Sequence, residues 1–334
     1  MKQSELSHYH KYTIFLILLT AACRIAAAFL LELGNDEAYY WIYSMHLQWN
    51  YFDHPPLVGL WIRMSTFNLA FISEGFIRLG SIFSCAVATW LMFKTSSTAF
   101  SERAGWYTAC LFNASFYVSV TAGVYILPDS PQIVFWTLSM YMLARIVKEE
   151  NSWKNWLLFG VGCGLCMMSK VHGVFLLTGL FLYVIFNKRH WLKNPRLYVS
   201  LLITMIIFLP VVIWNFQNDF ITYKFHSERV SLFSTDWNMK TFFIEIFSQL
   251  FLNNPVNVIL IMIALFTVSF RDSAGKIFKY IGIPLAVVLI FISLTRQTLA
   301  HWSGPAYVTL MPLAGRLLEK KYTKNFPFVL KLSM

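Results

Sequence analysis

The chain carries the stretch YTIFLILLTAACRIAAAFLLEL at residues 12–33, followed directly by GNDEAYYW at residues 34–41 and by YFDHPP at residues 51–56. The first part is long enough to cross a membrane as a helix, which takes about 20 apolar residues. The second part is an acidic island containing Asp36, Glu37 and Asp53. Carboxylates at the mouth of a span are costly to place and usually serve binding or chemistry. We therefore expect a membrane protein with a site beside its first span.

The composition of the whole chain supports this expectation. Hydrophobic residues make up 57% of the sequence, charged residues 13%, and the mean hydropathy is +0.56. Soluble domains carry about 25% charged residues. The net charge of +11 does not indicate nucleic-acid binding, because the sequence has no Gly-rich phosphate loop and no stripe of basic and aromatic residues. We expect membrane lipids as surroundings and no nucleic-acid partner.

Apolar runs along the chain predict the fold class. We expect an all-α polytopic membrane protein with about ten transmembrane helices, forming a single domain over residues 1–334. The candidate spans are 12–33, 76–93, 104–124, 130–147, 155–169, 173–187, 197–214, 247–270, 277–294 and 301–318. Such boundaries are accurate to a few residues.

Charge decides the orientation of these spans. The apolar stretch 155–187 has lysines or arginines on both flanks, so it should be a hairpin of two helices with both flanks in the cytoplasm. With that choice the basic residues gather on the inner side. The acidic island, Asp129, Lys170 and the loop 215–246 are then all outside. The net positive charge of the chain therefore reflects the positive-inside rule, and not a binding site for a polyanion.

The segment after the first span is too apolar to be a free loop. We expect two outer interfacial helices within residues 35–73, joined at Asp53-His54-Pro55-Pro56. The prolines suit the first turn of the second helix, and aromatic residues favour the depth of the membrane interface. The outer loop 215–246 is the other sizeable element outside the spans.

The acidic island contains the first candidate site residues. Asp36 and Glu37 are neighbours, so on a helix their side chains point about 100° apart and only one can face a given target. The alternative is that both carboxylates only stabilise the N-terminus of a helix and have no role in binding or chemistry. Asp53 and His54 can have a direct functional role, or they can have only a structural role in the turn before the prolines. Tyr40 is a candidate lining residue for a sugar or lipid path.

Further candidates lie at other outer span ends. Asp129 can cap the helix that follows it and still face a ligand. Lys170, at a hairpin tip beside His172, can either reach the interface or meet an anion. The remaining candidates for substrate binding are Asn215, Asp219, Arg229 and His301. The histidines have no ligand spacing, so we expect no metal and no cofactor, with a divalent metal as the alternative.

Taken in order, these motifs resemble a known family. They are Asp36-Glu37-Ala38-Tyr39-Tyr40-Trp41, Tyr51-Phe52-Asp53-His54-Pro55-Pro56-Leu57, Pro128-Asp129, Ser169-Lys170, Trp214-Asn215 with Asn218-Asp219, and His301-Trp302 with Pro305-Ala306-Tyr307. Over residues 10–318 the chain resembles bacterial membrane glycosyltransferases of the GT-C type. Within that type it is most similar to the protein O-mannosyltransferase-like and lipid A aminoarabinose transferase families.

This resemblance implies an enzyme of the bacterial cytoplasmic membrane with its active site on the outer face. The implied donor is a polyprenyl-phosphate-linked sugar, and the implied acceptor is a hydroxyl of a lipid, glycan or protein. It points to Asp36 as the catalytic base. Family members usually run longer, so we expect either a truncated C-terminal region or a short variant.

The chemistry of such a transfer agrees with the residues present. A lipid phosphate leaves as a stable anion, so the reaction needs a base for the acceptor and positive charge near the phosphate. Asp36 can supply the base, and Lys170, with Arg229 or Arg296, can supply the charge. A single base on the face opposite the leaving group predicts inversion at the anomeric carbon. The alternatives are a transporter or flippase of a lipid-linked substrate and a non-catalytic membrane subunit.

Overall fold

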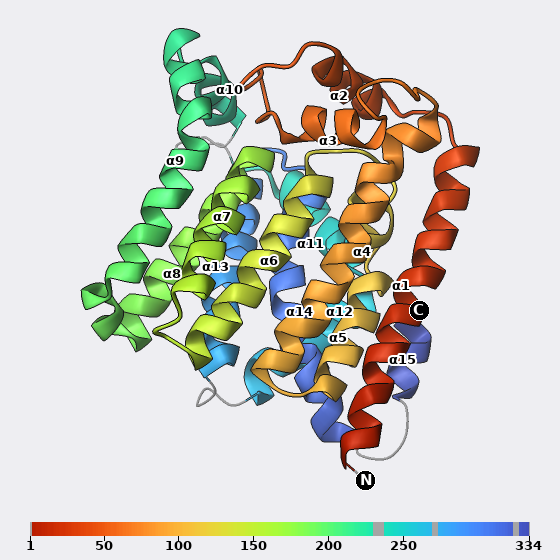
Figure 1. The fold of residues 1–334 in the computed structure, drawn as a ribbon, viewed down its shortest axis with the longest axis vertical. Coiled ribbons are helices and arrows are strands. Elements are labelled where there is room, and N and C mark those ends of the chain that lie inside the picture. The colour runs from red at the N-terminus through yellow and green to blue at the C-terminus, as the bar shows by residue number, and fades with distance from the viewer. Residues whose placement is uncertain (1, 230–236, 269–272, 323–326, 334) are drawn as a thin grey trace.

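The computed structural model describes residues 2–229, 237–268, 273–322 and 327–333, and within these ranges it is helical and has no β-strand. Most helices run along one bundle (Figure 1). In chain order they are α1 (Lys2–Leu30), α2 (Asn35–Met45), α3 (Leu57–Ser65), α4 (Glu74–Ala99), α5 (Glu102–Ala114), α6 (Asp129–Lys148), α7 (Trp153–Ser169), α8 (Val174–Asn187), α9 (Pro195–Gln217), α10 (Ile221–Arg229), α11 (Met239–Leu252), α12 (Pro255–Thr267), α13 (Ser273–Ser293), α14 (Gly304–Lys321) and α15 (Phe328–Ser333).

Two features of the bundle suit a membrane. Its interior is filled by large side chains such as Phe112, Trp136 and Trp156, which are fully buried. Its outer surface is also apolar, as on α1, where Phe15 is 66% exposed, and on α9, where Met205 is 66% exposed. Water does not favour so much exposed apolar surface, whereas lipid chains do.

Fewer helices than predicted can cross a membrane by length and apolar composition alone. Four of the described helices do so, and five if α11 and α12 count as one broken span; the four are residues 8–30, 74–99, 195–217 and 274–293. Helices α6, α7, α8 and α14 occupy other predicted spans but are shorter or less apolar. The total of ten spans stays a prediction.

Two of the predicted spans are not single straight helices. In the stretch 104–124, α5 ends at Ala114 and a short π-helix follows at Tyr117–Thr121. In the stretch 247–270, α11 and α12 meet at an angle of 97°. The second break has a clear cause, since Asn254 has a φ of 69° and Pro255 begins α12. Such a φ ends a helix, and proline then suits the start of the next one.

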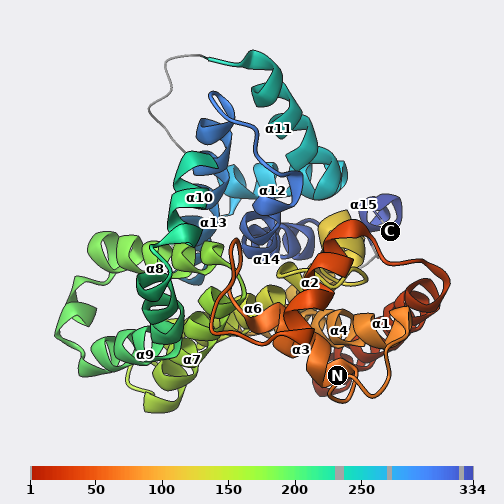
Figure 2. The ribbon, with the colours of Figure 1, turned by 90° about the horizontal axis from the view of Figure 1, so that it is seen from above.

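The predicted helices after the first span are present as α2 and α3, which lie across one end of the bundle (Figures 1 and 2). The second is shorter than expected, because residues 67–69 all have positive φ values. Helix α10 lies at the same end. Within the predicted outer loop 215–246, residues 230–236 lie outside the described residues.

Candidate functional site

A cavity of about 400 Å³ opens at the end of the bundle where α2 and α10 lie. Its walls come from α2, the turn before α3, the loop before α6, the end of α10 and the short helix η4 (Ala300–Ser303). The predicted site residues that line it are Asp36, Tyr40, Asp53, His54, Asp129, Arg229 and His301. Segments from residue 36 to residue 301 therefore meet in one place.

The first wall carries two carboxylates in different surroundings. Asp53 accepts hydrogen bonds from two tyrosines of α2: the Tyr39 hydroxyl lies 3.1 Å from its Oδ1, and the Tyr43 hydroxyl binds the same oxygen. Tyr43 is itself held by stacking on Tyr51, with ring centres 3.6 Å apart. Asp36 is exposed to the cavity, and none of the described residues gives it a hydrogen bond or ion pair.

The second wall carries a carboxylate that is already neutralised. Asp129 is the first residue of α6 rather than the residue before it, so it does not cap the helix as predicted. Its Oδ2 lies 2.8 Å from Lys170 Nζ, and its Oδ1 accepts a 3.1 Å hydrogen bond from the Tyr117 hydroxyl. His301 Nε2 lies 3.8 Å from the same carboxylate. Both members of the Asp129–Lys170 pair are 1% exposed.

The charge state of Asp129 follows from these neighbours. Burial alone would raise its pKa, but the charge of Lys170, with smaller contributions from His301 and His172, outweighs burial and lowers the pKa to about 2. The N-terminus of a helix also favours a negative charge at this position. Asp129 is therefore ionised at neutral pH.

This arrangement changes the expected role of Lys170. We predicted that it meets an anion, but its ammonium is buried against Asp129 and does not line the cavity. The cation that does line the cavity is Arg229, at the end of α10. Its guanidinium carbon lies 5.0 Å from the centre of the Phe225 ring and 5.8 Å from that of Trp302. None of the described carboxylates forms an ion pair with Arg229, so its charge faces the cavity.

Burial disfavours the charged form of the histidines around the cavity. Burial lowers the pKa of His54 well below its usual range, and the charge of Lys170 lowers it further. Burial also lowers the pKa of His226. His226 Nε2 lies 2.7 Å from the backbone oxygen of Asp53 and must donate there. Within the described part of the chain, no three His, Cys, Asp or Glu side chains are placed to hold a metal ion.

A second, apolar cavity of about 260 Å³ adjoins the first. The two share His54, His226 and Trp302, and the second is otherwise lined mainly by apolar side chains of α8 and α13. His172, predicted for substrate binding, lies here rather than in the polar cavity, with its ring centre 5.6 Å from that of Trp302. A ligand with a polar head and an apolar chain would match the two cavities together.

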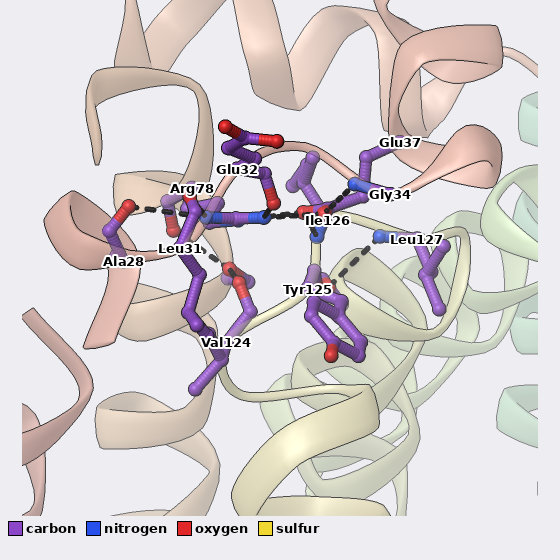
Figure 3. Close-up of polar contacts among 12 residues, drawn as sticks. Ala28, Leu31, Glu32, Gly34, Glu37, Arg78, Val124, Tyr125, Ile126 and Leu127 are labelled. Carbon is purple, nitrogen blue, oxygen red and sulfur yellow. Dashed lines mark hydrogen bonds and ion pairs between the residues drawn. The ribbon is translucent and has the colours of Figure 1, made fainter. Parts of the chain in front are cut away.

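Besides Lys170, three predicted site residues line neither cavity. Asn215 is buried near the end of α9, where its Nδ2 donates to Val211 O at 3.0 Å. Asp219 is exposed on the turn after α9 and has a φ of 54°. Glu37 is 2% exposed and binds Arg78 with both carboxylate oxygens, at 2.8 and 2.6 Å (Figure 3). The oxygens of Glu37 therefore already have partners within the chain, and its contact with substrate stays a prediction.

Several residues of the cavity were not among the predicted site residues, although Tyr39 was expected along a sugar or lipid path. Trp302, His226 and Tyr39 line the cavity, and Tyr43 and Tyr117 hold its carboxylates. Arg78 is the most informative omission. It is a charged residue within an apolar run, and such residues rarely occur there without a partner. The position of Arg78 within an apolar run thus indicated a buried partner, but the sequence alone did not identify that partner as Glu37.

Known proteins are similar to this chain in both sequence and fold. Residues 53–214 match the family model described as dolichyl-phosphate-mannose-protein mannosyltransferase. Lipid A galacturonosyltransferase RgtD of Rhizobium johnstonii is 23% identical over 89% of this chain and 63% of its own length. The undecaprenyl phosphate-alpha-4-amino-4-deoxy-L-arabinose arabinosyl transferase of Yersinia pestis is 25% identical over 58% of this chain and 36% of its own length.

Solved structures show the same fold. ArnT from Cupriavidus metallidurans bound to undecaprenyl phosphate superposes with a TM-score of 0.72 at 17% identity, covering 92% of this chain and 60% of ArnT. The oligosaccharyltransferase of Archaeoglobus fulgidus gives a TM-score of 0.57 at 14% identity, covering 97% of this chain and 54% of its own.

The chain is thus similar in sequence to membrane glycosyltransferases of the GT-C type, and it has their fold. It spans about three fifths of the length of RgtD and of ArnT. It is a multi-pass membrane protein.

Proposed function

We propose that this protein transfers a sugar from a polyprenyl-phosphate donor to an acceptor hydroxyl at the outer face of the bacterial cytoplasmic membrane, with inversion. One observation carries the proposal. A single cavity joins an unpaired carboxylate, Asp36, to a cation facing the same space, Arg229, and it adjoins an apolar cavity. A base, a phosphate-binding charge and room for a lipid chain are what this reaction requires.

Asp36 is the catalytic base in this proposal. Of the three carboxylates that line the cavity, Asp129 is bound by Lys170 and Asp53 accepts two tyrosine hydroxyls. A base has to be able to accept a proton from the acceptor. Asp36 has no competing donor among the described residues, and its place near the start of α2 favours the ionised form that a base needs.

The donor phosphate lies near Arg229 in this proposal. Arginine suits phosphate because its guanidinium can donate to two oxygens at once. Trp302 adjoins Arg229 and belongs to both cavities, so a phosphate bound there would leave its isoprenoid chain directed into the apolar cavity. Lys170 then acts indirectly, by holding Asp129 ionised and in place.

The names of the similar proteins suggest which classes of donor and acceptor to propose. RgtD is named for lipid A, and the Yersinia enzyme is named for a sugar on undecaprenyl phosphate. We therefore propose a lipid acceptor ahead of a glycan or protein. The charge asymmetry of the loops supports the outer-face position, because it predicts α2, α3 and α10 outside.

The experiment that tests this proposal compares Asp36→Asn with wild type in purified, lipid-reconstituted protein. The donors are undecaprenyl-phosphate-linked 4-amino-4-deoxy-L-arabinose and galacturonic acid, and the acceptor is lipid A. Removing a general base should cut turnover about 100-fold or more while donor binding survives. Glu319→Gln, which changes a carboxylate of α14 outside the cavity, is the matched control. Wild-type turnover in Asp36→Asn would transfer the role to Asp53.

A further inference from the structure

Arg78 of α4 has a hydrogen-bond acceptor for each of its N–H groups. Its Nε donates to Glu37 Oε1 at 2.8 Å, and its Nη2 donates to Glu37 Oε2 at 2.6 Å and to Glu32 O at 2.8 Å. Its Nη1 donates to Ala28 O at 3.1 Å and to Leu31 O at 2.6 Å. A guanidinium has five N–H groups. Arg78 therefore has no donor left for a ligand.

Glu37 is saturated in the same way. Besides the two bonds from Arg78, its Oε2 accepts from the backbone N–H of Gly34 at 2.9 Å and its Oε1 from that of Ile126 at 3.1 Å (Figure 3). A carboxylate offers about four acceptor positions. All four are used by groups of this chain, and each partner is a donor.

These bonds join parts of the chain that carry the cavity. Asp36 directly precedes Glu37, and Asp129 follows Ile126 by three positions. The loop that contains Ile126 is held to α4 a second time by Ser81, whose Oγ donates to Val124 O at 2.7 Å. The pair therefore connects the α2 wall of the cavity to the Asp129 wall through fully buried side chains.

We propose that Glu37 and Arg78 are positioning residues that set the spacing across the cavity between Asp36 and the Asp129 wall. The inference rests on the function proposed above. Stability alone is a weak reason for such a pair, because a buried ion pair is often no more stable than an apolar replacement. A two-pronged guanidinium–carboxylate contact does specify direction. Reacting atoms displaced by about 1 Å can cost a factor of about 100 in rate.

Glu37→Gln tests this role. Every partner of Glu37 is a donor, so the amide nitrogen of glutamine cannot replace the oxygen it substitutes. We expect kcat to fall by about 10- to 100-fold. The KM for donor should stay within about twofold, because Arg229 and Trp302 are on another wall. Hydrogen exchange at the amide of Ile126 should speed up, which reports the loosened loop directly.

Two further variants complete the test. Glu319→Gln removes a carboxylate from another ion pair, with Arg316 on α14, and should leave kcat and KM unchanged. Ser81→Ala removes one hydrogen bond to the same loop without touching a charge. It should lower kcat by about fivefold, the effect of losing about one hydrogen bond. If Glu37→Gln does not fold, Ser81→Ala tests the positioning role in its place.

The outcomes separate this inference from the proposed function. Loss of turnover in Asp36→Asn together with wild-type kcat in Glu37→Gln or in Ser81→Ala would overturn the positioning role alone. A rise in donor KM without a fall in kcat would also overturn it, since that would make the pair a binding element. Wild-type turnover in Asp36→Asn would instead remove the base on which the proposed function depends.

Discussion

Lys170→Met should destabilise the folded protein, because it leaves the Asp129 carboxylate buried without its counter-charge. Both side chains are 1% exposed and lie 2.8 Å apart. Removing one partner of a buried pair costs about 3–5 kcal/mol. The Tyr117 hydroxyl still donates to Asp129 and offsets about 1 kcal/mol of that cost. We expect a net loss of about 2–4 kcal/mol in the free energy of unfolding at neutral pH.

The same pair predicts how stability depends on pH. The pKa of Asp129 is about 2 in the folded protein, against 3.8 for an ordinary aspartate. A carboxylate whose pKa is lower when folded stabilises the fold above its unfolded pKa. That contribution, about 2 kcal/mol, is lost as the pH falls from about 4 to about 2. In Lys170→Met burial is no longer opposed, so the pKa of Asp129 should rise above its unfolded value; the variant should then gain stability, rather than lose it, as falling pH protonates Asp129.

The assay is equilibrium unfolding of detergent-solubilised protein, followed by tryptophan fluorescence at several pH values. Lys224→Met, on the exposed side of α10, is the control and should behave as wild type. The double variant Asp129→Asn with Lys170→Met removes both charges and should recover about 1–2 kcal/mol relative to Lys170→Met. Wild-type stability in Lys170→Met, together with weaker donor affinity, would refute the reasoning and return Lys170 to a phosphate-binding role.

Two further predictions concern the donor and the topology. Arg229→Gln should raise the KM for the undecaprenyl-phosphate donor by about 10-fold or more, the effect of losing a charge-assisted hydrogen bond; Lys224→Gln is its control, and an unchanged KM would place the phosphate elsewhere. In intact cells, a cysteine at Leu47 should react with a membrane-impermeant thiol reagent and a cysteine at Leu192 should not. Both positions are about 40% exposed, so accessibility is matched, and the reverse pattern would invert the proposed orientation.

Most of the lining of the cavity could be predicted from the sequence. Asp36, Asp129 and His301 each lie beside the end of a predicted span, and Asp53 lies at the junction of the two predicted interfacial helices. The charge asymmetry of the loops predicts all four on one side of the membrane. Residues at the same level of a bundle can meet whatever their separation along the chain. Membrane class and helical fold followed from composition, because a bilayer admits few other solutions for the backbone.

What each side chain binds could not be predicted in the same way. Lys170 is held by Asp129, 41 residues earlier, and Glu37 by Arg78, also 41 residues away. Those pairs depend on how α4, α6 and α7 pack, and local sequence does not encode packing. The sequence therefore identified the charged residues of the site. Only the tertiary structure decided which charged side chains pair with each other. Asp36 and Arg229 remain open to a substrate, because a charged side chain is free only when no distant segment supplies its partner.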